Sequence, residues 1–213
     1  MKGLLITLEG IDGSGKSTAA KLIASRLAET MPERRLVLTA EPTTGEVGRI
    51  LREEMARTGG DKSPPAQRMQ ELFLFMADHA HHLTKTVLPA LETGAIVLSD
   101  RYADSTAAYQ GVTLSGIVPD PVSWIQSIYR PWNLRPDRTL LFVLDPHAAL
   151  HRMQSRQGRQ KFERLEFLRS VDENFRRMAA LEPERFVRID AEQDAKKVAE
   201  EAIKAILDLI SSS

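Results

Sequence analysis

Eight consecutive residues near the start of the chain have the types and spacing of a phosphate-binding loop. Residues 10–17, GIDGSGKS, fit the pattern G-x-x-x-x-G-K-[ST]. The three glycines permit backbone angles that other residues avoid, so successive N–H groups can converge on phosphate oxygens. Lys16 adds a full charge, and the Ser17 hydroxyl is placed to ligate the Mg²⁺ that bridges the terminal phosphates. The loop therefore predicts that the chain handles ATP or GTP. The residues expected to wrap the triphosphate are Gly10, Ile11, Asp12, Gly13, Ser14, Gly15, Lys16, Ser17 and Thr18.

The sequence on either side supports this interpretation. Before the loop, residues 4–8 form a short apolar run typical of a strand buried on both faces. After it, Leu22, Ile23 and Leu27 fall on one stripe of a helix expected from residue 17 to about residue 30. A strand, a glycine loop and a helix N-terminus in this order build an anion site. We therefore prefer this interpretation to a glycine-rich turn with a chance lysine.

Composition places the chain among compact soluble proteins with one core. Its 213 residues are 42% hydrophobic and 27% charged, which is enough to bury a sizeable interior. The 29 basic and 29 acidic residues balance, so no overall charge favours a nucleic-acid or membrane partner. The absence of cysteine excludes disulfides and thiolate metal sites. No stretch approaches a membrane span, and we expect a cytoplasmic protein.

The order of the elements predicts an α/β fold. Segments with helical spacing separate further apolar, strand-like runs at residues 36–38, 95–98, 140–144 and 186–189. Such alternation implies a parallel sheet. A long helix is expected from about residue 66 to residue 91, and a closing helix from residue 195 to residue 210. The expected fold is a three-layer αβα domain of the P-loop NTPase type, with five parallel strands, covering residues 1–213.

Polar residues follow the predicted strand ends, where ligands bind in an open parallel sheet. Asp100 and Arg101 come directly after the strand at residues 95–98. A carboxylate there can hold the water shell of Mg²⁺, and a guanidinium can clamp a phosphate. Taken alone the two residues would indicate a surface ion pair. Beside a phosphate loop, they indicate a crevice for two phosphate-bearing substrates.

A basic segment at residues 151–165 suits a mobile lid within the domain. It has few apolar anchors and contains Arg152, Arg156, Arg159, Lys161 and Arg164. Closure over a triphosphate would bring in positive charge and expel water, and both effects lower the barrier to phosphoryl transfer. A solvated helix face is the simpler interpretation of such a charge run, and the residues alone leave both open.

Together these motifs resemble the thymidylate kinases over nearly the whole chain. The resemblance is carried by TLEGID at residues 7–12, by the pair Glu41 and Pro42, and by DRYADSTAAYQG at residues 100–111. It implies transfer of the γ-phosphoryl group of ATP to dTMP with Mg²⁺, giving dTDP and ADP, in a homodimer. The transition state of such a transfer is loose, so it needs positioning and charge and no protein nucleophile.

The family's pattern also implies individual roles. Lys16 and Arg101 would bind the phosphates in flight, Ser17 would ligate Mg²⁺, Asp100 would hold its waters and Asp12 would orient the sugar of dTMP. Phe75 would stack on thymine, although most aromatic residues on an apolar helix are simply core. The other acceptor-site residues that the resemblance implies are Glu41, Pro42, His79, Ser105, Thr106, Tyr109 and Gln110.

The chain departs from the family's usual pattern at three positions. Some members carry an arginine where Gly13 stands, so here Arg156 or Arg159 should reach the transferred phosphoryl group. Members commonly have an arginine where His79 stands, and we expect this histidine to donate to the base. An arginine often precedes the Glu-Pro pair, whereas this chain has Ala40, which puts one contact to the dTMP phosphate in doubt.

Other classes fit less well. A GTP-binding switch reads guanine through an Asn-Lys-x-Asp run, and neither Asn133 nor Asn174 belongs to one. The balanced charge argues against a strand-binding ATPase. His81 and His82 invite a metal interpretation, but adjacent residues on a helix point in different directions. Residues 112–136 are expected to serve packing. The closest alternative is a small-molecule kinase for another nucleoside monophosphate or a deoxynucleoside.

Overall fold

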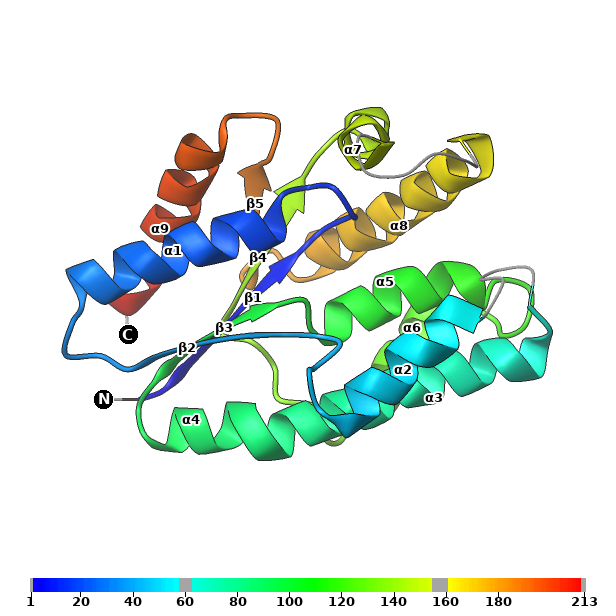
Figure 1. Ribbon diagram of the computed structural model, residues 1–213, viewed down its shortest axis with the longest axis horizontal. Helices are drawn as coiled ribbons and strands as arrows, with labels where there is room; N and C mark the ends of the chain where they lie inside the picture. The colour runs from blue at the N-terminus through cyan, green and yellow to red at the C-terminus, as the bar shows by residue number, and fades with distance from the viewer. Residues whose placement is uncertain (1, 58–62, 155–160, 212–213) are drawn as a thin grey trace.

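A parallel β-sheet forms the centre of the protein in the computed structural model, which describes residues 2–57, 63–154 and 161–211. Within these residues the sheet has five strands in the order β2-β3-β1-β4-β5 (Figure 1). They are β1 (Leu4–Glu9), β2 (Leu36–Ala40), β3 (Ile96–Asp100), β4 (Arg138–Val143) and β5 (Phe186–Asp190). All four pairings are parallel, which confirms the predicted sheet.

The central position of β1 explains its largely apolar sequence. All six residues of β1 are buried, because helices cover both faces of the sheet and strands pair with both edges of β1. Asp100 lies opposite Leu8 on one side of β3 and opposite Ala40 on the other. The carboxyl ends of these strands therefore open at the same edge of the sheet.

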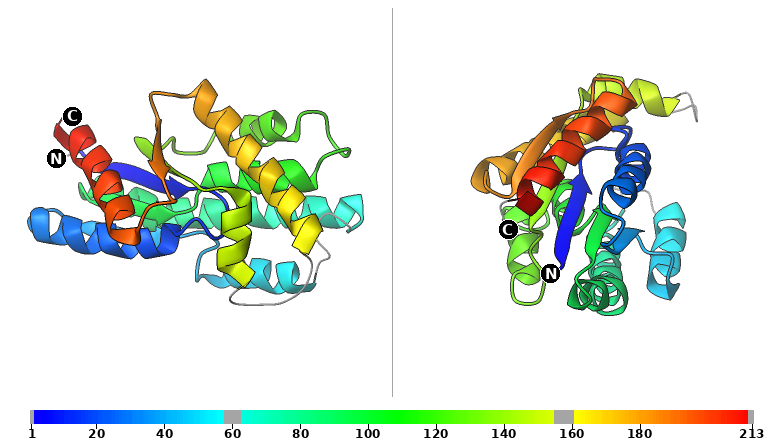
Figure 2. Two further views of the ribbon diagram at one scale, coloured as in Figure 1. Left: turned by 90° about the horizontal axis from the view of Figure 1, so that it is seen from above. Right: turned by 90° about the vertical axis from the view of Figure 1, so that its left-hand side faces the viewer.

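Helices cover the sheet on both sides. On one side, α1 (Lys16–Thr30) packs against α9 (Ala195–Ser211) (Figure 1). α2 packs along α3 and lies away from the sheet (Figure 2). None of the described helices is long and apolar enough to span a membrane. The other helices are α2 (Glu46–Arg57), α3 (Pro65–His82), α5 (Ala103–Thr113), α6 (Pro121–Tyr129), α7 (Pro146–Gln154) and α8 (Lys161–Leu181).

The long helix predicted for residues 66–91 is present with one irregularity. α3 continues into a π-helical turn, η2 (Leu83–Val87), and then into α4 (Leu88–Glu92). Pro89 accounts for the change, since it has no N–H for the carbonyl of Lys85 and its ring would collide with that carbonyl in an α-helix. A wider turn before the proline relieves the clash. The predicted helix is thus present over its length, and the π-helical turn within it was not predicted.

A buried ion pair joins the start of β5 to α5. Arg185, which is 5% exposed, donates to both carboxylate oxygens of Asp104 at 2.5 and 3.1 Å. The same guanidinium donates to the hydroxyl of Thr139 in β4 and to Glu182 at the end of α8. These contacts fix the first turn of α5 against the sheet, directly after Arg101.

The central strand should dominate the stability of the fold. Leu5 is fully buried in β1, and its replacement by alanine would leave a cavity. We expect Leu5→Ala to lower the free energy of unfolding by about 3 kcal/mol in urea denaturation. Leu181→Ala is the control, because that side chain is 71% exposed. It should change the value by less than about 0.5 kcal/mol. Equal losses from both variants would contradict this account of the core.

Candidate functional site

The predicted phosphate loop joins β1 to α1 in the conformation that its glycines allow. Gly10, Gly13 and Gly15 all have positive φ, and α1 begins at Lys16. A Cβ atom on Gly13 would lie 2.7 Å from the carbonyl oxygen of Ala149 in α7. Space and backbone angle therefore both exclude a side chain at position 13. The positive end of α1 and the loop amides face the anion site.

Lys16 lies within the loop and is 5% exposed. Its ammonium donates to the carbonyl oxygens of Gly10 at 3.0 Å and Ile11 at 2.8 Å, and to the hydroxyl of Ser14 at 3.2 Å. Burial, together with the nearby charge of Arg101, lowers the pKa of Lys16 to about 7. A bound polyanion would stabilise the charged form and raise this pKa.

Ser17 and Asp100 meet as the sequence predicted. The Ser17 hydroxyl, in the first turn of α1, donates to Oδ2 of Asp100 at 2.5 Å. Hydroxyl and carboxylate oxygens are the hard ligands that suit Mg²⁺. No group of three or more His, Cys, Asp or Glu side chains in the described parts of the chain could hold a metal by itself. A cation here would therefore take its other ligands from phosphate and water.

Arg101 joins the phosphate loop to α5. It follows β3 with φ 71°, and its N–H donates to the carbonyl of Leu8 at 3.0 Å. The guanidinium donates to Asp12 at 2.5 Å and to Ser105 at 2.9 Å, and it lies 4.9 Å from the centroid of the Tyr109 ring. The Tyr109 hydroxyl in turn accepts the N–H of Asp12 at 2.8 Å. Four residues predicted for the site are thus in direct contact.

Glu9 is a member of this cluster for which sequence reasoning predicted no role, although it lies at the strand end expected to open onto the crevice. Its buried carboxyl accepts a hydrogen bond from Ser105. Within the described residues, Oε1 of Glu9 has no hydrogen-bond partner. Burial, and then the charge of Asp104, raise the pKa of Glu9 well above its usual range. The signal was a glutamate closing an otherwise apolar strand beside the loop.

The segment after β2 is held by residues that the sequence did not single out. Asp78 on α3 accepts the N–H of Thr43 at 2.7 Å and its hydroxyl at 2.5 Å. Arg52 on α2 donates to the carbonyls of Pro42 and Thr43 at 3.1 and 2.6 Å. We call residues 41–45 the acceptor loop, because they stand where the sequence predicted part of the acceptor site. No local pattern marks Arg52 or Asp78, since their partners lie on other elements.

His79 is placed differently from expectation. It is fully buried, and its Nδ1 lies 2.8 Å from Oε1 of Glu41 while its Nε2 lies 2.9 Å from Oδ1 of Asn133. The rings of Tyr129 and Trp132 pack against it edge-on. Both ring nitrogens are therefore used inside the protein, and the geometry does not favour donation to a base.

The remaining predicted acceptor residues lie on α3 and α5. Phe75 is partly exposed, whereas Thr106 and Gln110 are buried on α5. The amide of Gln110 donates to Glu71 at 2.8 Å, and its oxygen accepts from Thr113 at 2.6 Å. Gln110 thus connects α5 to α3.

The predicted lid is described only in part. Arg156 and Arg159 lie outside the described residues. Arg152, at the end of α7, donates twice to the carbonyl of Ala191 at 3.1 Å, and Arg164 on α8 is exposed.

A cavity of about 540 Å³ adjoins Ser17 and Asp100 on the side of β2. Ala40 lines it, and Lys21 on α1 and His81 on α3 are its basic neighbours. Ala40, which stands where an arginine was expected from the family's pattern, thus lies on the wall of this cavity.

Comparison with known proteins agrees with this geometry. The family model described as "Thymidylate kinase" matches residues 8–203. A probable thymidylate kinase from Methanococcoides burtonii is 44% identical over 212 residues and is covered completely, as is this chain. One from Methanosarcina acetivorans is 46% identical, with 99% of this chain and 98% of the relative covered. The crystal structure of thymidylate kinase from Ehrlichia chaffeensis has a TM-score of 0.74 and 28% identity, covering 97% of this chain and 100% of that one.

Binding of a nucleoside triphosphate should take up a proton at Lys16. At pH 8 a group with a pKa of about 7 is mostly neutral, and the phosphates restore its charge. Calorimetry with a nonhydrolysable ATP analogue, in buffers of different ionisation enthalpy, should show uptake of most of one proton at pH 8 and little at pH 6. Lys16→Arg is the matched control, because arginine stays protonated and should abolish the uptake. Equal uptake in that variant would contradict the assignment to Lys16.

Proposed function

The chain belongs to the thymidylate kinase family, and we propose that it transfers the γ-phosphoryl group of ATP to dTMP, giving dTDP and ADP. The convergence of Arg101, Asp12, Ser105 and Tyr109 beside the phosphate loop carries this proposal. It puts one half-buried guanidinium next to the phosphate loop and to α5, which we propose lines the acceptor site. The whole of residues 1–213 then acts as one kinase domain.

The donor half of the site is built from backbone and Lys16. The loop amides and the start of α1 bind the β- and γ-phosphates, and Lys16 exchanges its three internal hydrogen bonds for phosphate oxygens. Ser17 and Asp100 would hold Mg²⁺, which neutralises charge on the phosphates when it is bound. Their oxygens already converge, which fits a hard cation.

The acceptor half is built from α3, α5 and the acceptor loop. Arg101 binds the dTMP phosphate and the group in transfer, so it stabilises charge that is shared between donor and acceptor. Asp12 fixes the guanidinium and orients the sugar. Phe75 stacks on thymine, and Thr106 with Gln110 lines the base pocket. These roles follow from the family resemblance together with the observed positions.

The lid should supply further positive charge to the phosphates of the bound donor. Because Ala149 leaves no room for a side chain at Gly13, the loop itself cannot carry an arginine. This supports the role of Arg156 or Arg159, which stays a prediction. Water exclusion by closure of residues 151–165 would strengthen each phosphate contact.

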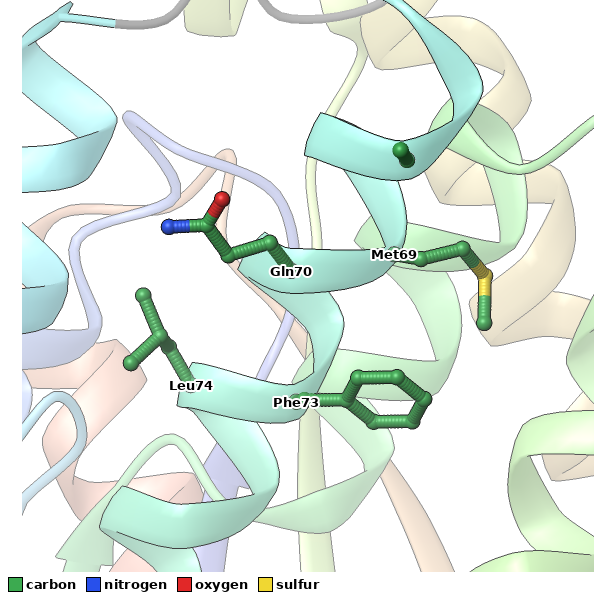
Figure 3. Close-up of a pocket in the computed structure, with 5 residues that line it drawn as sticks. Met69, Gln70, Phe73 and Leu74 are labelled. Carbon is green, nitrogen blue, oxygen red and sulfur yellow. The ribbon is translucent and has the colours of Figure 1, made fainter.

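We also propose that the enzyme works in the cytoplasm, where ATP and nucleoside monophosphates are available, as a homodimer. The outward face of α3 supports the dimer. Ala66, Met69 and Phe73 line a shallow apolar hollow with Gln70 and Leu74, and Phe73 is 54% exposed. Met69 and Phe73 point to one side of the helix, and Gln70 and Leu74 to the other (Figure 3). An apolar helix face of this kind suits a second copy of the chain.

The activity is tested with a panel of acceptors. With ATP and Mg²⁺, dTMP should give the highest kcat/KM among dTMP, dCMP, dGMP, AMP and thymidine in an assay of ADP release. Arg101→Ala should lower kcat at least ~100-fold, because it removes charge from the transition state. The control Arg26→Ala removes an exposed arginine that pairs only with Glu29 in its own helix, and should leave kcat unchanged. A better acceptor than dTMP would overturn the proposal.

The dimer is tested on α3. Phe73→Glu puts a charge into the centre of the apolar face and should convert the dimer to monomer in light scattering at micromolar concentration. Leu181→Glu changes an equally apolar residue that is 71% exposed at the end of α8, and should leave the dimer intact. A wild-type protein that is monomeric, or a Phe73→Glu dimer of unchanged affinity, would contradict this interface.

A further inference from the structure

The carboxylate of Glu41 is shared by two buried histidines. Its Oε1 lies 2.8 Å from Nδ1 of His79 and 2.7 Å from Nδ1 of His82. Both histidines are at most 1% exposed. A carboxylate oxygen can only accept, so each Nδ1 carries the hydrogen. Glu41 is also the first residue of the acceptor loop, and its N–H donates to the carbonyl of Asp100 at 3.1 Å.

The outer nitrogens of the two histidines have different partners. Nε2 of His79 faces Oδ1 of Asn133 at 2.9 Å, and an amide oxygen is also an acceptor. His79 must therefore carry a hydrogen on both nitrogens to make its two bonds. Nε2 of His82 faces the hydroxyl of Thr39 at 2.8 Å, which can donate, so His82 makes both bonds as a neutral ring. The hydrogen bonds therefore require a charged ring at His79 but not at His82.

We propose that His79 is a positioning residue that acts through Glu41: as a buried imidazolium bonded to Glu41 and Asn133, it locks the acceptor loop in place instead of reading the base. The proposal rests on the proposed function for its consequence in catalysis. Three side chains of α3 then hold the loop together, since Asp78 binds Thr43 while His79 and His82 bind Glu41. We call this hydrogen-bonded group of Glu41, His79 and His82 the lock. Asn133 connects it to the segment before β4.

The groups around His79 favour its charged form. From the acceptor loop it faces Glu41, from its own helix the charge of Asp78 acts on it, and the other rings against it are Tyr102, Tyr129 and Trp132. Although burial acts to lower the pKa of His79, the charge of Glu41 and the two hydrogen bonds outweigh it and raise the pKa above its usual value. Burial likewise opposes the ionised form of Glu41, yet the charge of His79 and the bonds to both histidines lower the pKa of Glu41.

These two shifts give the pH dependence its sign. The lock is complete when Glu41 is ionised and His79 is protonated. It is lost as the pH rises through the raised pKa of His79, and also as the pH falls through the lowered pKa of Glu41. We therefore expect the KM for dTMP to rise on the alkaline side, with kcat little changed, because positioning of the acceptor loop affects acceptor binding.

Nuclear magnetic resonance tests the lock without any activity. In protein labelled with ¹⁵N at histidine, both nitrogens of His79 should have imidazolium shifts at pH 7. His79→Gln identifies the signal. A neutral His79 at pH 7 overturns the proposal, whatever acceptor the enzyme uses. An imidazolium in a protein that fails to phosphorylate dTMP would refute the proposed function and leave the lock in place.

Kinetics separates a lock from a base contact. Under the proposal, His79→Gln raises the KM for dTMP ~10-fold, which corresponds to about 1.4 kcal/mol, and leaves the preference for dTMP over dCMP unchanged. Asn133→Asp, a matched change, should move the alkaline limb of kcat/KM to higher pH, and Asn133→Leu should move it to lower pH. Two results would overturn the proposal. One is loss of the preference for dTMP over dCMP in His79→Gln, and the other is an alkaline limb of kcat/KM at the same pH in both Asn133 variants as in the wild type.

Discussion

The half-buried guanidinium of Arg101 is the group on which the arrangement of the crevice depends. It lies where β3 ends beside β1, and it contacts Asp12 in the phosphate loop and Ser105 and Tyr109 on α5. A charge in such a place is costly unless it is paired and hydrogen-bonded. The neighbouring residues meet that requirement, and phosphates bound on either side would meet it better. The cost of burial is thereby offset in the state that binds substrate.

A series of neighbouring polar and charged side chains keeps the Arg101 guanidinium in position. Ser105 links Arg101 to Glu9, and the raised pKa of Glu9 favours its neutral form. Asp104 lies close enough to contribute to that shift, but its own charge is compensated by Arg185. If Glu9 and Asp104 were both ionised without Arg185, their repulsion would act directly below the site. The buried ion pair is thus part of what orients α5, beyond any contribution to stability.

Short-range features of the fold could be predicted from the sequence. The phosphate loop is specified by eight adjacent residues, and the strands by apolar runs that the sheet buries on both faces. The contacts of Arg101 could be anticipated as a group, because the strand ends must meet at one edge. The π-helical turn before Pro89 was not predicted, because the spacing of apolar residues is unchanged by a proline that lacks one N–H. No role could be predicted for Glu9, because the residues that shape its surroundings, Ser105 and Asp104, are distant in sequence.

His79 shows the limit of reasoning from local pattern and family resemblance. Its position on α3 matches a residue expected to face the base, and the helix does bring it to that side of the crevice. A histidine side chain is shorter than an arginine side chain, and Glu41 is the partner its Nδ1 reaches. Glu41 and Asn133 are 38 and 54 residues away from His79 in sequence. A local stretch of sequence around His79 therefore cannot reveal these hydrogen-bond partners. At this position α3 therefore contacts the acceptor loop, whereas the family resemblance implied a contact to the ligand. Under the proposed function, base selectivity would then depend on residues such as Gln110 and Thr106 on α5, whose first turn is held by the ion pair of Asp104 and Arg185.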